Sequence, residues 1–286
     1  MLKTIARAKI NLTLRVLGKS ETGFHLIESI TAFSDFGDEV EIFTNSSRDQ
    51  LEISGPFSKD LEGDNIVVKA LESFRKETIW TQPITIKIFK QIPVAAGLGG
   101  GSADAACVLK MLNLLAPKAR VSEEKMGEIG LNLGSDVPAC LSGKTLKMEG
   151  RGEKLSIIGR IPNMPILLVN PNIRLSTKAV FETFSKKGLF KPADENANVD
   201  VEKIFKGIGC NTPNDLIEPA IKLAPVIKEV LFVLRKLKGI KTVGMSGSGA
   251  TCFALFEPND TVSVIKAEEQ IKNYGWWTAS TFLKGA

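Results

Sequence analysis

The chain has 286 residues, of which 43% are apolar and 24% are charged, and its formal net charge at pH 7 is +5. This is the composition of a folded globular protein, so a chain that is disordered along most of its length is excluded. The basic residues are spread without a lysine- or arginine-rich run, which argues against a nucleic-acid-binding surface. A mild positive balance suits a small anionic substrate.

The cysteines at positions 107, 140, 210 and 252 lie far apart and form no CxxC pair, which argues against a zinc or redox motif. Cys107 and Cys252 stand in apolar stretches, where we expect buried free thiols of the kind found in a reducing cytoplasm. The first residues form no continuous apolar signal segment, and no stretch approaches the ~20 apolar residues that span a bilayer. We therefore expect a cytoplasmic protein with no membrane partner.

The first half of the chain begins with apolar and polar residues that alternate over positions 6–16, which predicts one half-buried strand whose polar face could simply be solvated. Short strands are expected at 39–43 and 51–53, and a helix at 65–74. An alternating strand at 84–89 leads directly into a glycine-rich loop, and a helix over 103–115 follows. A second helix is expected at 122–134, with Ser122 as its N-cap.

The second half begins with a polar, glycine-rich stretch at 150–159 that fits a domain junction. After it we expect a strand at 165–169, a helix at 177–184, a mobile polar segment at 191–200 and helical structure over 214–238. A second glycine cluster precedes a strand at 251–256, and a helix at 261–273 leads to a strand near 276. Strands and helices mix without strict alternation, which predicts an α+β fold.

The glycine-rich loop is the most informative segment. A GxGxxG fingerprint fails at Ser102, and a P-loop ending at 143–145 fails because Pro138 stands where glycine is required. A glycine run between a strand and a helix lets backbone N–H groups approach an anion, helped by the helix dipole. A merely flexible loop is the alternative. We predict that phosphate groups bind the segment Pro93, Val94, Ala95, Ala96, Gly97, Leu98, Gly99, Gly100, Gly101, Ser102 and Ala103.

This loop resembles the ATP-binding motif of the GHMP kinases, a superfamily of small-molecule kinases. Further matching segments lie along nearly the whole chain, at positions 8–12, 23–25, 64–67, 134–138, 214–216 and 246–250. The resemblance implies a two-domain fold, with a nucleotide-binding domain like domain 2 of ribosomal protein S5 and a ferredoxin-like C-terminal domain. We place an N-terminal ATP-binding domain at 1–157 and a C-terminal substrate domain at 158–286.

The resemblance also implies the reaction and its catalytic residues. It is strongest to the branch that phosphorylates the 2-hydroxyl of a diphosphocytidyl methylerythritol in the non-mevalonate isoprenoid pathway. By the match, Asp136 is the general base and Lys9 its electrostatic partner. Taken alone, Asp136 before Val137-Pro138 could equally be a helix N-cap, and Lys9 could belong to a solvated strand face.

The same match assigns substrate-binding residues. Phe24 and His25 are placed at the cytosine, with Phe181 on the other side of the base, although a lone histidine and an aromatic residue are also ordinary structural elements. Position 24 is usually tyrosine in this family, so phenylalanine keeps the ring face and lacks the hydroxyl. The remaining assignments place Asn11 and Thr177 at the substrate, Asn65 near the adenine, and Ser246, Gly247, Ser248 and Gly249 in the third family motif, which could also be a plain tight turn.

The resemblance implies ATP as cofactor with Mg²⁺, whose protein ligands the sequence does not assign. The expected partner is a small molecule, a cytidine diphosphate derivative, and the chain is expected to be a monomer or a weak homodimer. The alternatives are another GHMP kinase that acts on homoserine or a sugar, and a catalytically silent nucleotide-binding homologue. The pair Phe24-His25 argues against the first alternative, and the presence of both Lys9 and Asp136 argues against the second.

Overall fold

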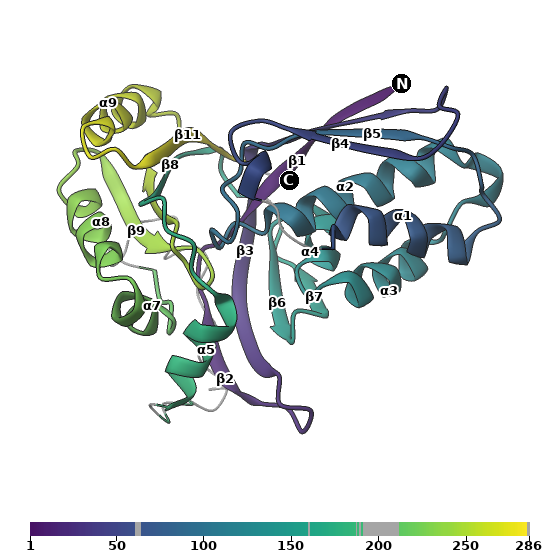
Figure 1. Cartoon of the computed structure of the whole chain (residues 1–286). Helices are drawn as coiled ribbons and strands as arrows, with labels where there is room; N and C mark the ends of the chain where they lie inside the picture. Colours follow the sequence, from purple (N-terminus) through teal and green to yellow (C-terminus); the bar gives the residue numbers. More distant parts are fainter. Residues whose placement is uncertain (61–63, 160, 187, 189, 191–211, 285–286) are drawn as a thin grey trace. The chain divides into compact units, whose positions relative to one another are not determined.

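The computed structural model describes all residues except 61–63, 160, 187, 189, 191–211 and 285–286 (Figure 1). The segment 191–200 and Cys210, on which predictions were made above, therefore lie outside the described residues.

The chain folds into two compact units, each built from segments that are distant in sequence. Unit 1 comprises Met1–Lys9, Phe36–Val94 and Gly99–Gly143, and unit 2 comprises Ile10–Asp35, Ala95–Leu98 and Lys144–Ala286. The glycine-rich loop is thus shared, because residues 95–98 belong to unit 2 while the loop's two ends belong to unit 1. A domain division at 157/158 stays a prediction.

The elements follow in chain order. They are β1 Leu2–Asn11, β2 Arg15–Lys19, β3 His25–Phe43, β4 Gln50–Ser54, η1 Ser58–Asp60, α1 Ile66–Glu77, β5 Thr85–Phe89, α2 Gly100–Leu115, η2 Pro117–Ala119, α3 Glu123–Leu133, α4 Val137–Ser142, β6 Leu146–Gly150, β7 Lys154–Ile157, β8 Met164–Asn170, α5 Thr177–Lys186, α7 Ile217–Leu223, α8 Val226–Arg235, β9 Ile240–Met245, β10 Cys252–Phe256, α9 Thr261–Lys272 and β11 Trp277–Leu283.

The prediction of one strand over 6–16 is wrong, because β1 ends at Asn11 and β2 begins at Arg15. The N–H groups of Leu12 and Thr13 both donate to the carbonyl of Ile30, at 2.7 and 3.4 Å. Two residues opposite one is the pattern of a bulge, which interrupts the regular ladder. The polar face is not solvated either, since Lys9, Asn11 and Thr13 are buried.

Unit 1 combines a small set of strands with packed helices. Strand β4 pairs in parallel with β5, and β5 pairs antiparallel with the 39–43 part of β3. Helix α2 contacts α1, α3 and α4. Apolar residues of α1 recur at helical spacing and are buried at Val67, Ala70, Leu71 and Phe74. The small residues Ala103, Ala105 and Ala106 are buried at the start of α2, which allows close approach of its neighbours.

Unit 2 contains an antiparallel sheet in which β11, β8, β10 and β9 are neighbours in that order. Helices α8 and α9 contact this sheet, α8 through β9 and β10 and α9 through β8 and β11. With α8 and α9 as its two helices, the sheet follows the order strand, helix, two strands, helix, strand of a ferredoxin-like domain, and α5 and α7 are added between β8 and α8. Strand β8 is buried along its whole length, as its run of apolar residues predicts. The prediction of a ferredoxin-like C-terminal domain is confirmed.

Other boundaries differ from the sequence predictions for local reasons. The helical segment expected at 214–238 is divided into α7 and α8 at Pro225, which lacks an N–H and cannot continue a helix. The glycine-rich stretch at 150–159 forms part of a hairpin, since β6 and β7 pair across the turn at 151–153. Helix α2 starts at Gly100, three residues earlier than predicted, so the glycines of the loop form its first turn.

The cysteine predictions hold where the structure describes them. Cys107, Cys140 and Cys252 are free and buried, and burial raises the pKa of each thiol above its ordinary value. In the described part of the chain, no helix is long and apolar enough to cross a membrane.

Candidate active site

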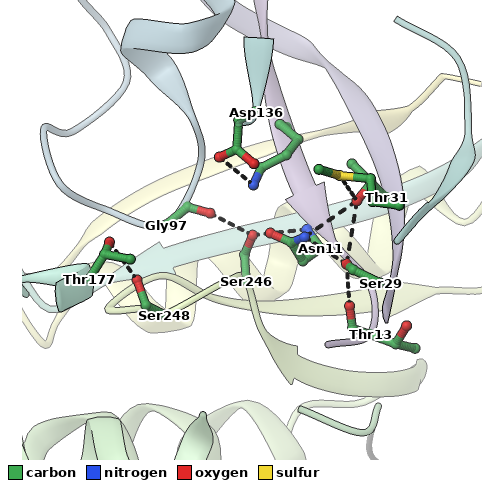
Figure 2. A network of polar contacts seen from close by, with 11 residues as sticks. Asn11, Thr13, Ser29, Thr31, Gly97, Asp136, Thr177, Ser246 and Ser248 are labelled. Atoms are coloured by element: carbon green, nitrogen blue, oxygen red, sulfur yellow. Dashed lines mark hydrogen bonds and ion pairs between the residues drawn. The ribbon is translucent and has the colours of Figure 1, made fainter. Parts of the chain in front are cut away.

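An ion pair in unit 1 joins two residues that are 127 positions apart in sequence. The ammonium Nζ of Lys9, near the end of β1, donates to Oδ2 of Asp136 at 2.8 Å (Figure 2). The Lys9 side chain is 5% exposed and that of Asp136 is 32% exposed. The ammonium is therefore held inside the fold, while the carboxylate keeps access to solvent and to a ligand.

Asp136 occupies the N-cap position of α4, as its sequence context allows. Its side chain, however, makes no capping hydrogen bond, and its backbone is in the right-handed helical region. The carboxylate bonds to Lys9 instead. Helix capping is thus not what this carboxylate does, which removes the simplest structural alternative for Asp136.

The start of α2 lies directly against this ion pair. Gly99 is the N-cap of α2 and has left-handed backbone geometry, with φ of 63°. A Cβ atom at Gly99 would lie 3.3 Å from Cε of Lys9 and 3.6 Å from Oδ2 of Asp136. The free N–H groups of a helix start and the helix dipole favour an anion. A helix start that could bind an anion therefore adjoins the Lys9–Asp136 pair within unit 1.

In unit 2, the middle of the glycine-rich loop contacts the second glycine cluster. The hydroxyl of Ser246 donates to the carbonyl of Gly97 at 2.8 Å (Figure 2). The N–H of Thr251 donates to the carbonyl of Ala96 at 3.1 Å. A Cβ atom at Gly97 would lie 2.3 Å from the carbonyl oxygen of Ser246, and its φ is 77°. Only glycine fits at position 97 in this arrangement.

Asn11 connects the same glycine cluster to β3. Its N–H donates to Oγ of Ser246 at 3.1 Å, and its amide nitrogen donates to Ser29 at 2.7 Å and to Thr31 at 3.3 Å (Figure 2). Its amide oxygen Oδ1 is buried and has no hydrogen-bond partner among the residues that the structure describes. A Cβ atom at Gly247 would lie 3.2 Å from that oxygen. A buried acceptor without a partner is costly, so a ligand donor would be favoured there.

Thr177 and Ser248 bring a third element into the site of unit 2. The hydroxyl of Thr177, the first residue of α5, hydrogen-bonds to Oγ of Ser248 at 2.9 Å (Figure 2). The amide of Asn214 donates to the carbonyls of Met245 and Gly247 at 2.7 and 2.9 Å. These bonds hold the turn around Gly247 from two sides, which fixes the backbone of the second glycine cluster.

The aromatic residues assigned to the cytosine lie at the start of β3 and on α5. The rings of His25 and Phe181 are tilted by 32° against each other with centroids 4.6 Å apart, and Nε2 of His25 lies 2.7 Å from Oγ of Ser185. Burial, followed by the charge of Lys19, lowers the pKa of His25 below its ordinary value. The exposed ring of Phe24 lies 3.8 Å below the guanidinium of Arg151.

The remaining predicted residue, Asn65, is the N-cap of α1, where its side-chain oxygen accepts from the N–H of Val67 at 2.8 Å. Sequence reasoning missed Ser29 and Thr31, which bind the Asn11 amide. Their signal is weak, because hydroxyl residues within a strand are common on solvated and buried faces alike. It also left Asn214 without a role, although that residue belongs to a segment that matches the superfamily.

A glycine-rich helix start beside a lysine–aspartate pair, and a ferredoxin-like domain, are what the resemblance to the GHMP kinases predicts. The model of the GHMP kinases N terminal domain matches residues 65–144, and that of the GHMP kinases C terminal domain matches residues 194–274. The chain belongs to the GHMP kinases. The predicted α+β, two-domain GHMP kinase fold is thereby confirmed.

Two similar proteins have the same name. A 4-diphosphocytidyl-2-C-methyl-D-erythritol kinase of Ruegeria pomeroyi is 41% identical over 97% of this chain and 98% of its own. Its namesake from a Chelativorans species is 38% identical over 98% and 95%.

Solved structures agree with this family assignment. A crystal structure of 4-(cytidine 5'-diphospho)-2C-methyl-D-erythritol kinase is 30% identical, covers 100% of both chains and has a TM-score of 0.82. The homoserine kinase of Cytophaga hutchinsonii is 18% identical, covers 99% of this chain and 94% of its own, and has a TM-score of 0.71, which shows a shared fold.

Proposed function

We propose that this chain transfers the terminal phosphoryl group of ATP to the 2-hydroxyl of 4-diphosphocytidyl-2-C-methyl-D-erythritol, a step of non-mevalonate isoprenoid synthesis. The observation that carries the proposal is the Lys9–Asp136 ion pair, 2.8 Å long, next to the N-cap glycine of α2. The choice of acceptor is supported by relatives of this name, which match the chain over nearly their whole length.

The triphosphate binds at the glycine-rich loop. Phosphoryl transfer depends on positioning and on stabilising the charge of the transferring group. Backbone N–H groups at the start of α2 supply donors for phosphate oxygens, and Gly99 leaves room for the backbone to approach them. Residues Pro93 to Ala103 form this cradle, and Asn65 stands at the adenine.

Asp136 acts as the general base, and Lys9 acts as its electrostatic partner. The acceptor hydroxyl gives its proton to the carboxylate of Asp136 as its oxygen attacks the phosphorus atom. Lys9, bonded to the same carboxylate, orients it and stabilises negative charge on the attacking oxygen. Because Lys9 is buried, its charge acts in a medium where electrostatic interactions are strong.

The acceptor substrate binds to residues of unit 2. Asn11 and Thr177 contact its polyol and diphosphate parts, and the buried Oδ1 of Asn11 supports this assignment. His25, Phe24 and Phe181 bind the cytosine, the two phenylalanine rings by stacking and His25 by hydrogen bonds from its side chain or its backbone. Ser246 to Gly249 form the third family motif.

Mg²⁺ accompanies ATP in this proposal and neutralises the charge of its phosphates. The described residues contain no group of three or more histidine, cysteine, aspartate or glutamate side chains that could hold a metal ion. Mg²⁺ is usually bound by phosphate oxygens and water with one or two carboxylates.

A coupled assay of ADP release tests the function. Purified protein receives ATP and Mg²⁺ with the cytidyl substrate, with no acceptor, with homoserine or with a sugar. We expect ADP only with the cytidyl substrate, and one phosphate added to its 2-hydroxyl by ³¹P NMR. ADP release with homoserine or a sugar, and none with the cytidyl substrate, would mean that the acceptor differs from the one proposed. ATP binding without turnover of any acceptor would mean that the chain is a silent homologue.

A further inference from the structure

A buried charge cluster in unit 1 has no part in the reaction described so far. It consists of Asp38 on β3, Lys90 directly after β5 and Asp104 on α2, all of them buried. The ammonium of Lys90 donates to Oδ2 of Asp104 at 2.6 Å and also to Oδ2 of Asp38. Buried charges are costly unless they are paired, so three of them in contact call for a role.

The cluster connects the two ends of the glycine-rich loop. Oδ1 of Asp38 accepts from the N–H groups of Gln91 and Ile92 at 2.6 and 2.9 Å, which fixes the chain just before the loop. Lys90 then links that strand end to Asp104, on the helix that follows the loop. These bonds set the spacing between the points where the loop leaves unit 1 and returns to it.

The first turn of α2 packs against this cluster. A Cβ atom at Gly100 would lie 3.1 Å from Cγ2 of Ile92 and 3.5 Å from Nζ of Lys90. Asp104 is four residues beyond Gly100, or about 6 Å along the helix axis. A phosphate group at the helix start and the carboxylate of Asp104 therefore act on each other through the protein interior, where salt screens little.

The cluster contains two carboxylates and one ammonium. Oδ1 of Asp104 is buried and, within the described part of the chain, has no hydrogen-bond partner. Burial, together with the charge of Asp38, raises the pKa of Asp104 to about 7 despite the opposing effect of Lys90, while the two carboxylates keep the pKa of Lys90 raised. The thiols of Cys107 on α2 and Cys140 on α4 also interact with Asp104, and with pKa values of about 12 they stay neutral.

We propose that Asp104 is a positioning residue of the ATP site, which holds the first turn of α2 through Lys90 and takes up a proton from solvent when the triphosphate binds. The inference rests on the proposed binding of ATP at this loop. The incoming phosphates add negative charge at the helix start, and protonation of Asp104 removes one negative charge behind it. The cluster behind the first turn of α2 then has no net charge when ATP is bound.

Calorimetry with Asp104→Asn tests this inference. Asparagine has the same shape and still offers an acceptor to Lys90, but it cannot titrate. ATP with Mg²⁺ is titrated into the full chain at pH 6.0, 7.5 and 8.5, in buffers with different ionisation enthalpies. At pH 7.5 we expect the unmutated protein to take up more protons than Asp104→Asn. At pH 8.5 the variant should bind ATP about 3- to 30-fold more tightly, with no difference at pH 6.0.

Glu128→Gln is the matched control, because it removes one carboxylate charge from the exposed face of α3. It should match the unmutated protein in affinity and proton uptake. Equal proton uptake by the unmutated protein and Asp104→Asn would overturn the inference, as would equal affinity at pH 8.5. No ATP binding by the unmutated protein would instead contradict the proposed function.

A second measurement serves if Asp104→Asn does not fold. In the unmutated chain labelled with ¹³C at aspartate carboxyls, one buried carboxyl should titrate near pH 7, and ADP should shift its midpoint upward. A midpoint that ADP leaves unchanged, or no such carboxyl, would overturn the inference.

Discussion

Replacing Asp136 by asparagine removes the carboxylate charge beside Lys9 and leaves an oxygen acceptor in nearly the same place. General-base catalysis is typically worth ~10²–10⁴-fold in rate, or about 2.7–5.4 kcal/mol in activation free energy. We therefore expect kcat to fall by that factor. Breaking a fully buried ion pair costs about 3–5 kcal/mol of stability. Because the Asp136 side chain is 32% exposed and asparagine still accepts from Lys9, we expect a loss of only about 1–2 kcal/mol.

The assay measures kcat and KM separately, with ADP release at saturating cytidyl substrate and varied ATP, and thermal unfolding on the same samples. KM for ATP should change little, because phosphate contacts at the start of α2 remain. Asp260→Asn is the matched control, since Asp260 is also at a helix N-cap, where it accepts from the N–H of Ser263 at 3.0 Å. It should leave kcat unchanged and should affect stability alone.

A kcat for Asp136→Asn within about fivefold of the unmutated value would refute the assignment of Asp136 as base. A double variant tests whether the pair acts as one unit. If Lys9→Met lowers kcat as much in the Asp136→Asn background as it does alone, the two residues act independently and the proposed partnership is wrong.

Two further predictions concern the glycine-rich loop and the recognition of cytosine. Gly99→Ala places a Cβ atom 3.3 Å from Cε of Lys9, in a left-handed conformation that costs alanine about 1–2 kcal/mol. The ATP affinity measured by calorimetry and kcat should therefore both fall. Gly127→Ala, with open space around it, should leave both unchanged. An unaltered ATP affinity in Gly99→Ala would speak against the phosphate cradle. In kcat/KM, the enzyme should prefer the cytidyl over the uridyl substrate, since each unmatched buried polar group costs about 1–3 kcal/mol. Phe24→Ala should lower kcat/KM for both substrates by the same factor, and His25→Ala should narrow the difference in kcat/KM between them. Equal kcat/KM for the two substrates in the unmutated enzyme would contradict cytosine recognition.

Local features of the sequence were sufficient for the elements around the phosphate loop. Alternation predicted the strand that became β5, and glycine and alanine content predicted the loop and α2. Ser122 was correctly predicted as the N-cap of α3, where its hydroxyl accepts from the N–H of Lys125. Such features depend on residues only a few positions apart, so their physics is readable in the chain itself.

Long strands and their interruptions were not predictable in this way. Of β3, only positions 39–43 were expected, although the strand extends from His25 to Phe43. The bulge after Asn11 arises because the N–H groups of Leu12 and Thr13 both donate to the carbonyl of Ile30, which lies on β3. Strand pairing is decided by partners that are distant in sequence, and no local pattern encodes them.

The sequence by itself determined the glycine-rich loop, the α+β class and, through its motifs, the resemblance to the GHMP kinases. Only the tertiary structure decided that Lys9 is buried and bonded to a carboxylate 127 positions away. It also decided that Lys90 lies between Asp38 and Asp104. A lysine in an alternating strand has the same local pattern on a solvated face as in the interior. Its partner is set by long-range packing, because burying a charge is tolerable only where folding brings an opposite charge within reach.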